Sequence, residues 1–476
     1  MTMDVVRVKI DKNANKSRDG TSSERNTKTS EPAQQSSPEM QLLTAVKQEN
    51  IAEIVRLYSR GASGNVQDGH GNNLLHIAVK KGNLQVVQAV LLFYGRRYSL
   101  CSKRNRDGKL PEELSYSIEI RGCIEIIHKG KEANDITKKN ADSAQNVSHS
   151  SRNAMQDIDN QINKQNIDAM LKRKDKLAIL LSLDGGGIRG LILIRILIYL
   201  EWKLGSSFWE KVDWVAGTST GAILALGLGK KHSPEHIERA YLRLKNDVFV
   251  GRRPYNPKTF ERFLKDELGS DSMGSIKHPK IVVTTCLTHV APPRLKLFRN
   301  YKPNINDEDC KRFKYEEPSH VPLWRAARCS SAAPTYFPPF EDIYSDGGIM
   351  ANNPTMELLT EFFRYKSIEI CTHSGKPMDE SLGCVISLGT GVVPAIKITA
   401  SDGIPVDQSR AWCMSLDVPF FRFSPPLRDA IELNERDDKC LISMLWDAEL
   451  YMASARCADQ VDELVDFLKR IKPVEK

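Results

Sequence analysis

The chain has 476 residues and a formal net charge of +8, with 41% hydrophobic and 27% charged residues. This composition is that of a globular protein with room for two or three domains, and it excludes a fibrous or wholly disordered chain. The basic excess fits an anionic membrane surface, whereas no interleaving of aromatic and basic residues favours nucleic acid. No apolar run reaches the roughly 18 residues that cross a bilayer, and the polar N-terminus carries no secretory signal.

The ten cysteines are scattered singly, without a CxxC pair or a metal-like spacing. This pattern favours reduced thiols in a cytoplasmic protein over a disulfide framework, and it predicts no metal site.

A repeat follows the polar N-terminus. Residues 1–38 are rich in Ser, Lys, Asn, Thr and Glu, and we expect them to be disordered. Within residues 39–131, the apolar pattern around Ala45-Val46 returns around Ala78-Val79, about 33 residues later, which is the ankyrin period. The sequence therefore predicts a short all-α ankyrin-repeat block.

The second repeat contains Leu75-His-x-Ala78, which resembles the ankyrin helix start. We expect His76 to bind backbone groups of the turn rather than to act in catalysis. One or two repeats cannot bury their faces alone, so they must stack on each other or on a neighbour. We expect this block to bind a protein partner or a second copy, and the polar residues 132–175 to form a linker. A membrane contact by its basic end, Lys172-Arg-Lys174, is the alternative to a solvated end.

Strands and helices alternate from residue 176 onward. An amphipathic helix is predicted at Leu191–Lys203, after a glycine loop. This alternation predicts a three-layer α/β/α sandwich over residues 176–395, with a helical extension over residues 396–476. Four segments have the length and apolar character of buried strands: Leu177–Leu183, Val212–Ala216, Lys280–Thr285 and Gly383–Leu388.

The string Gly217-Thr218-Ser219-Thr220-Gly221 lies between a predicted strand and an apolar helix. This context is typical of a nucleophile elbow, in which a sharp turn exposes the serine hydroxyl and small neighbours let strand and helix close around it. A packing turn with an inert serine is the alternative.

A second glycine motif, Asp184-Gly185-Gly186-Gly187-Ile188-Arg189-Gly190, contains a GxGxxG string. A dinucleotide site is disfavoured, because Asp184 would approach the pyrophosphate and no strand ending in an acidic residue follows about 20 positions later. Three glycines at a helix N-terminus instead predict an oxyanion hole, with backbone N–H groups aimed at a developing alkoxide. Arg189 would add positive charge, useful near a phosphate group.

A nucleophilic serine needs a base, and the histidines are poor candidates. His373 lies in a polar segment, while His289 and His320 lie in predicted loops. Asp346, in Ser345-Asp346-Gly347-Gly348, is the better candidate, because a partly buried carboxylate close to the hydroxyl can accept its proton. An ordinary Asp-Gly turn would be the interpretation if this motif stood alone.

These three motifs, in this order, resemble those of patatin-like phospholipases. Much of the chain from residue 177 is similar to the group VI calcium-independent phospholipase A2 enzymes, which also carry ankyrin repeats. Further segments carry the resemblance: Asp213–Gly221, Leu297–Tyr301, Trp324–Arg328, Ala332–Phe337, Ala351–Pro354, Ser387–Gly391, Arg410–Trp412 and Leu445–Tyr451.

The resemblance implies hydrolysis of the sn-2 ester of glycerophospholipids at a peripheral membrane surface, without calcium or a cofactor. It implies that Ser219 is the nucleophile and Asp346 its base, in a dyad without histidine. It also implies that Gly185, Gly186 and Gly187 supply the oxyanion donors, with Arg189 supporting. A triacylglycerol lipase, lysophospholipase or transacylase at the same site remains an alternative, as does an inactive ankyrin scaffold.

The chain departs from the family pattern in two places. The ankyrin block is much shorter than in the long relatives, so their oligomerisation and partners carry over only as expectations of a homodimer or a protein partner. The segment Val418–Arg422 corresponds to a calmodulin-binding region, but Pro419 interrupts any helix through it. A strand or loop is therefore predicted there, and calmodulin is kept as the alternative.

Overall fold

The computed structural model describes residues 37–130, 149–372, 380–394 and 404–471. The disorder expected for residues 1–38 falls almost wholly outside this part of the chain. All elements described below belong to one compact unit, Pro38–Lys476. No helix in the described ranges is long and apolar enough to cross a membrane.

The N-terminal block consists of helix pairs. Asn50, Asn73 and Asn83 each cap the N-terminus of a helix with their side chains. Before α5, a short 3₁₀ turn, Pro111–Leu114, stands where the first helix of a third pair would lie. The α-helices of this block are α1 (Pro38–Lys47), α2 (Ile51–Ser59), α3 (Leu74–Lys81), α4 (Leu84–Val90) and α5 (Ile118–Lys129).

His76 has the structural role predicted for it. Its Nδ1 accepts a hydrogen bond from the Asn73 N–H at 3.3 Å, and its Nε2 lies 2.9 Å from the Lys109 carbonyl. The imidazole thereby links the first turn of α3 to the turn of the next repeat.

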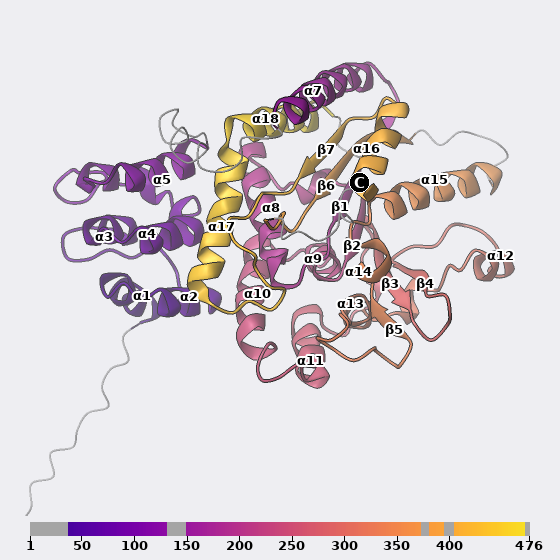
Figure 1. Cartoon of the computed structure of the whole chain (residues 1–476), viewed down its shortest axis with the longest axis horizontal. Coiled ribbons are helices and arrows are strands. Elements are labelled where there is room, and N and C mark those ends of the chain that lie inside the picture. Colours follow the sequence, from indigo (N-terminus) through magenta and orange to yellow (C-terminus); the bar gives the residue numbers. More distant parts are fainter. Residues whose placement is uncertain (1–36, 131–148, 373–379, 395–403, 472–476) are drawn as a thin grey trace, which may run out of the picture. The chain divides into compact units, whose positions relative to one another are not determined.

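A mixed seven-stranded sheet forms the centre of the second part (Figure 1). The strand order is β4-β3-β2-β1-β6-β7, and β5 pairs with β3. β1, β2, β3, β6 and β7 are parallel, whereas β4 and β5 run antiparallel to β3. The strands are β1 (Lys176–Leu183), β2 (Trp214–Thr218), β3 (Lys280–Leu287), β4 (Arg294–Arg299), β5 (Tyr344–Asp346), β6 (Glu380–Leu388) and β7 (Phe420–Phe423).

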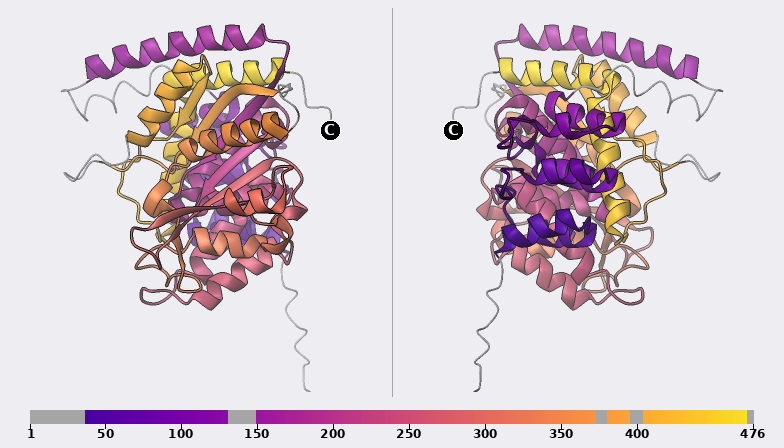
Figure 2. Two further views of the ribbon diagram at one scale, coloured as in Figure 1. Left: turned by 90° about the vertical axis from the view of Figure 1, so that its right-hand side faces the viewer. Right: turned by 90° about the vertical axis from the view of Figure 1, so that its left-hand side faces the viewer.

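Helices cover both faces of this sheet, which confirms the predicted α/β/α sandwich. α8, α10 and α17 lie on one side, and α15 and α16 on the other (Figures 1 and 2). The helices of this part are α7 (His149–Leu171), α8 (Gly190–Leu204), α9 (Thr220–Gly229), α10 (Pro234–Asp247), α11 (Pro257–Leu268), α12 (Asp307–Arg312), α13 (Leu323–Ser330), α14 (Gly348–Ala351), α15 (Thr355–Thr372), α16 (Ile404–Ser415), α17 (Asp438–Ala453) and α18 (Ala455–Arg470).

Two segments differ in detail from the expectation. Helix α7 occupies much of the predicted linker, and its Asn163 side chain bonds both the N–H and the carbonyl of Phe420. In the segment Val418–Arg422, for which a strand or loop was predicted, strand β7 begins at Phe420, directly after Pro419, and pairs with β6 at the edge of the sheet.

The ankyrin block is joined to the sandwich by buried polar contacts. The Tyr58 hydroxyl of α2 donates to Glu238 of α10 at 2.5 Å. Arg195 of α8 also bonds to Glu238 and donates to the carbonyl of Leu92 at 2.8 Å. Arg195 is 3% exposed and Glu238 is fully buried. The face of the repeats formed by α2 and α4 is therefore occupied by the chain's own second part.

Candidate active site

Ser219 lies at a sharp turn between β2 and α9. Its φ of +52° and ψ of −117° are unusual for a residue with a side chain, and such strain is characteristic of a nucleophile elbow. Gly217 and Gly221 are required by close approach: a Cβ on Gly217 would lie 2.5 Å from the Gly221 carbonyl oxygen, and one on Gly221 would clash with the carbonyl of Leu183. Ser219 itself is 9% exposed.

The threonines on either side of Ser219 hold the turn. The Thr218 hydroxyl donates to the Ala351 carbonyl at 2.6 Å. The Thr220 hydroxyl donates to the Tyr241 hydroxyl at 2.6 Å, and Tyr241 donates in turn to the Thr220 carbonyl at 2.9 Å. These bonds fix the backbone on both sides of the serine.

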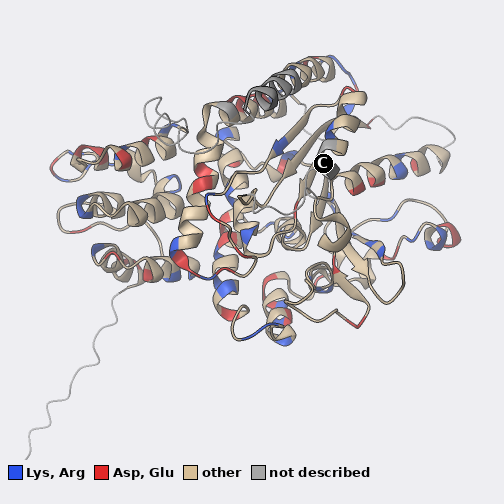
Figure 3. Ribbon diagram, in the orientation of Figure 1, with Lys and Arg blue, Asp and Glu red and all other residues tan. Residues whose placement is uncertain are grey.

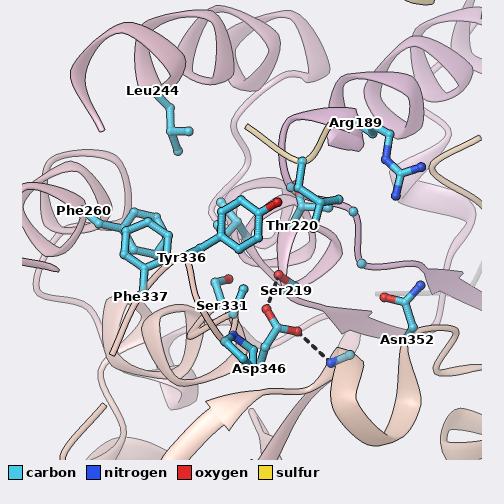
Figure 4. A pocket seen from close by; sticks show the side chains of 18 of the residues that line it. Arg189, Ser219, Thr220, Leu244, Phe260, Ser331, Tyr336, Phe337, Asp346 and Asn352 are labelled. Carbon is cyan, nitrogen blue, oxygen red and sulfur yellow. Dashed lines mark hydrogen bonds between the residues drawn. The ribbon is translucent and has the colours of Figure 1, made fainter. Parts of the chain in front are cut away.

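Asp346 meets Ser219 from the end of β5. The Ser219 hydroxyl donates to Asp346 Oδ2 at 2.7 Å, and the Gly348 N–H donates to Oδ1 at 2.7 Å (Figure 4). Gly347 lies so close to Thr284 that a Cβ there would be 2.6 Å from the Thr284 carbonyl oxygen. The pairing of β5 with β3 thus brings together two residues that are 127 positions apart.

Asp346 is only 6% exposed. Burial raises its pKa to about 6, although the hydrogen bonds from Ser219 and from the Gly348 N–H act in the opposite direction. A carboxylate with this pKa is ionised at neutral pH and is a stronger base than an ordinary aspartate. The pair can therefore activate a serine hydroxyl for attack on a carbonyl group.

The glycine loop lies opposite this pair, but its three amides are not equivalent. The Gly185 N–H donates to the Asn352 carbonyl at 3.0 Å. The prediction that Gly185 is an oxyanion donor is therefore wrong, because its N–H is already used in holding the loop. The Gly186 and Gly187 N–H groups bond to no other described residue, and both glycines line the same cavity as Ser219.

Several side chains that hold the site were missed in the sequence. Asp184 accepts two hydrogen bonds from Arg422 of β7, at 2.6 and 3.0 Å, and one from Asn353 at 2.8 Å. The Ser219 N–H donates to the Ser330 hydroxyl at 2.7 Å. Asn353 lies in the Ala351–Pro354 string, which was noted only as part of the family resemblance. The sequence around Arg422 and around Ser330 does not indicate which residue each of them contacts.

The cavity beside Ser219 has a volume of about 450 Å³. Arg189 and Asn352 lie on one side of Ser219 in Figure 4, and the aromatic rings lie on the other. No histidine lines the cavity in the described ranges, and His373 lies outside them. Apolar side chains make up most of the wall: Ile223, Tyr241, Leu244, Phe249, Phe260, Pro334, Tyr336, Phe337, Ile349 and Leu433.

The chain is similar to known proteins in both of its parts. Residues 181–359 match the patatin-like phospholipase family, and residues 42–91 match ankyrin repeats. The chain is 32% identical to a Caenorhabditis elegans protein named intracellular phospholipase A2, over 90% of this chain and 44% of that relative. It is 36% identical to the rat 85/88 kDa calcium-independent phospholipase A2, over 61% of this chain and 40% of the relative. The chain thus spans less than half the length of these relatives.

Proposed function

We propose that the chain is a calcium-independent phospholipase A2, on the premise that residues 181–359 match the patatin-like phospholipase family. The proposed reaction hydrolyses the sn-2 acyl ester of a glycerophospholipid to a lysophospholipid and a free fatty acid. The observation that carries the proposal is the 2.7 Å hydrogen bond from the Ser219 hydroxyl to Asp346, beside a cavity with an apolar wall.

In this proposal, Ser219 Oγ attacks the ester carbonyl carbon while Asp346 Oδ2 takes the hydroxyl proton. The Gly186 and Gly187 N–H groups stabilise the oxyanion of the tetrahedral intermediate. The ester C–O bond then breaks, and the leaving lysophospholipid oxygen takes the proton from Asp346. A water molecule, deprotonated by Asp346, then attacks the acyl-serine. The bond from the acyl carbon to Ser219 Oγ breaks, the fatty acid is released, and Oγ takes the proton back from Asp346.

The apolar wall of the cavity supports the proposal that the acyl chain of the substrate binds there. The side chains of Leu244, Phe260 and Phe337 offer hydrocarbon and aromatic surface, and the last two rings stack with centroids 4.7 Å apart. Arg189, on the other side of Ser219, supplies positive charge suited to the phosphate of the head group.

Fatty-acid release from phospholipid vesicles in the presence of a calcium chelator tests this function. Wild-type protein is expected to release one fatty acid per lipid and leave a lysophospholipid, whereas Ser219→Ala is expected to release only the background amount. Equal release by both proteins would refute the proposal. An added lysolipid acceptor distinguishes a transacylase, which would form a second lipid product, and triacylglycerol as substrate distinguishes a lipase.

The raised pKa of Asp346 predicts how the activity falls on the acid side of its pH profile. Because protonated Asp346 cannot take the Ser219 proton, kcat/KM is expected to fall as the pH drops below about 6. At about pH 5, roughly a tenth of the neutral-pH value should remain. The profile is measured with a soluble short-chain ester, so that vesicle binding does not contribute. Activity that is constant down to about pH 4 would show that an ordinary carboxyl, or none, is involved.

We also propose that the protein acts in the cytoplasm, bound peripherally to a phospholipid surface at the mouth of the cavity. Val250 and Met350 are 53% and 48% exposed, and each follows a cavity-lining residue in the sequence. Arg252 adds basic charge in the loop that joins α10 to α11 (Figure 3), whereas its neighbour Arg253 pairs with Glu432 at 2.7 Å. Apolar insertion and attraction to anionic lipid would act together there.

Replacing Val250 and Met350 together by Asp is expected to weaken binding to anionic vesicles at least about tenfold, since each buried apolar side chain contributes roughly 1.5–3 kcal/mol. Vesicle co-sedimentation measures the binding. Hydrolysis of a soluble ester should be nearly unchanged. Ile118→Asp, on the ankyrin block and 73% exposed in the native chain, is the matched control. An equal loss with Ile118→Asp would refute the proposed membrane face.

The ankyrin repeats are proposed to bind a protein partner or a second copy through surface not occupied by the sandwich. A homodimer and calmodulin remain the specific partners proposed from the family resemblance.

A further inference from the structure

Two histidines and a glutamate gather where three helices meet, away from the cavity. His232 lies in the turn between α9 and α10, His236 in the first turn of α10, and Glu267 near the end of α11. One potential ligand atom from each residue lies within 4.8 Å of the other two. The cluster plays no part in the proposed reaction, since none of the three residues lines the cavity.

The separations in this cluster suit a metal ion. His236 Nε2 and Glu267 Oε2 are 3.2 Å apart, and the two imidazole centroids are 4.5 Å apart. Tetrahedral zinc with bonds of about 2.0–2.1 Å separates two of its ligand atoms by about 3.3 Å. The His236–Glu267 pair therefore already forms one edge of such a site, and a small rotation of His232 would bring in the third ligand.

The residue types select the ion. Imidazole nitrogen suits zinc and other late transition metals, whereas calcium and magnesium prefer sites made only of oxygen. Two imidazoles and one carboxylate, with a fourth position open to water, form a ligand set that zinc accepts in proteins.

The surrounding bonds fix the backbone at the two histidines and the side chain of Glu267. The backbone N–H of His232 donates to the Gly227 carbonyl at 3.1 Å, and the backbone N–H of His236 donates to the Ser233 hydroxyl at 3.2 Å. Arg243 binds Glu267 Oε1 at 2.7 Å, which leaves Oε2 directed at His236. Arg243 is thus an outer partner of Glu267, and partners of this kind orient metal ligands in known sites.

We propose that His232, His236 and Glu267 form a zinc-binding site that joins α9, α10 and α11. Since α10 and α11 also carry Tyr241, Leu244 and Phe260 of the cavity wall, bound zinc would brace the helices around the acyl-chain cavity. The cysteine spacing gave no sign of a metal site, because this one uses no cysteine and draws on residues 35 positions apart.

The test is a zinc titration of the full chain, monitored by competition with a chromophoric zinc chelator, after metal has been stripped with a stronger chelator. The exposed thiols Cys371 and Cys440 are replaced by Ser so that they do not contribute. One equivalent of zinc is expected to bind and to raise the thermal unfolding temperature.

His232→Gln and His236→Gln are each expected to lower the zinc affinity at least about tenfold. Gln at position 236 can still hydrogen-bond to Glu267 but is a poor zinc ligand, so its effect separates ligation from a structural hydrogen bond. His289→Gln, in an exposed loop, is the matched control and should bind as the parent does. The proposal is overturned if no stoichiometric zinc binds, or if the affinity is unchanged by the two cluster variants.

Discussion

Asp346→Asn is expected to lower kcat/KM for phospholipid hydrolysis by about 10⁴-fold, because asparagine fills the same space but cannot accept the proton of Ser219. Ser219→Ala is expected to be at least as impaired. Combining the two should cost no more than Ser219→Ala alone, since residues that act as a unit are not additive. Initial rates of fatty-acid release, with substrate concentration varied, measure all three variants.

Asp342→Asn is the matched control for this series. Asp342 is exposed, four positions before Asp346, and has a positive φ of 54°, which asparagine also tolerates. It is expected to keep nearly full activity. Labelling with a fluorophosphonate should be lost in Ser219→Ala and strongly slowed in Asp346→Asn. If Asp346→Asn retained more than about a tenth of the activity with an unchanged fold, another group would have to be the base.

The parts of the site that depend on local backbone geometry were predicted from the sequence. The Gly217–Gly221 string requires a tight turn after a buried strand, and the strand–turn–helix pattern around it is visible in the apolar runs. Asp346 was chosen as the candidate base by setting the histidines aside, and its pairing with Ser219 was supported by the family resemblance, because no local rule connects residues 127 positions apart.

The error at Gly185 has the same origin. Its N–H is used by the Asn352 carbonyl, and the sequence does not show which backbone groups meet in space. The bond from Arg422 to Asp184 likewise spans 238 positions. Glycine content predicted the loop, whereas long-range contacts decide which of its amides remain available to a ligand.

The fold could be predicted from the sequence to about the same extent as the site. The four strands identified as apolar runs are all present, because buried parallel strands are continuously hydrophobic. The antiparallel strands β4 and β5 were not identified. β4 is half exposed and includes Arg294 and Lys296, and β5 has only three residues, so neither gives a distinct pattern. Helix α7 lies in a segment whose polar composition resembles a linker.

Glu238→Ala is expected to destabilise the protein by about 3–5 kcal/mol, because it leaves the buried Arg195 without its principal partner. Arg195 is 3% exposed, so its charge is buried. The other carboxylate near it, Glu449, lies 3.7 Å away and also pairs with Arg96 at 2.8 Å. The Tyr58 hydroxyl would also lose its acceptor. The midpoint of urea unfolding, for variant and wild type, measures the change.

Glu235→Ala, on the same helix but half exposed, is the control and should change the free energy of unfolding by less than about 0.5 kcal/mol. Equal effects of the two variants would mean that Glu238 contributes no more than a surface charge.

The same contacts predict that a chain lacking residues 1–131 will not fold stably, because Glu238 loses Tyr58 and Glu449 loses Arg96. Helix α8, which carries Arg195, starts at the glycine loop. Loss of the ankyrin face is therefore expected to disturb the oxyanion donors as well, so that the repeats support catalysis by holding α8 in place.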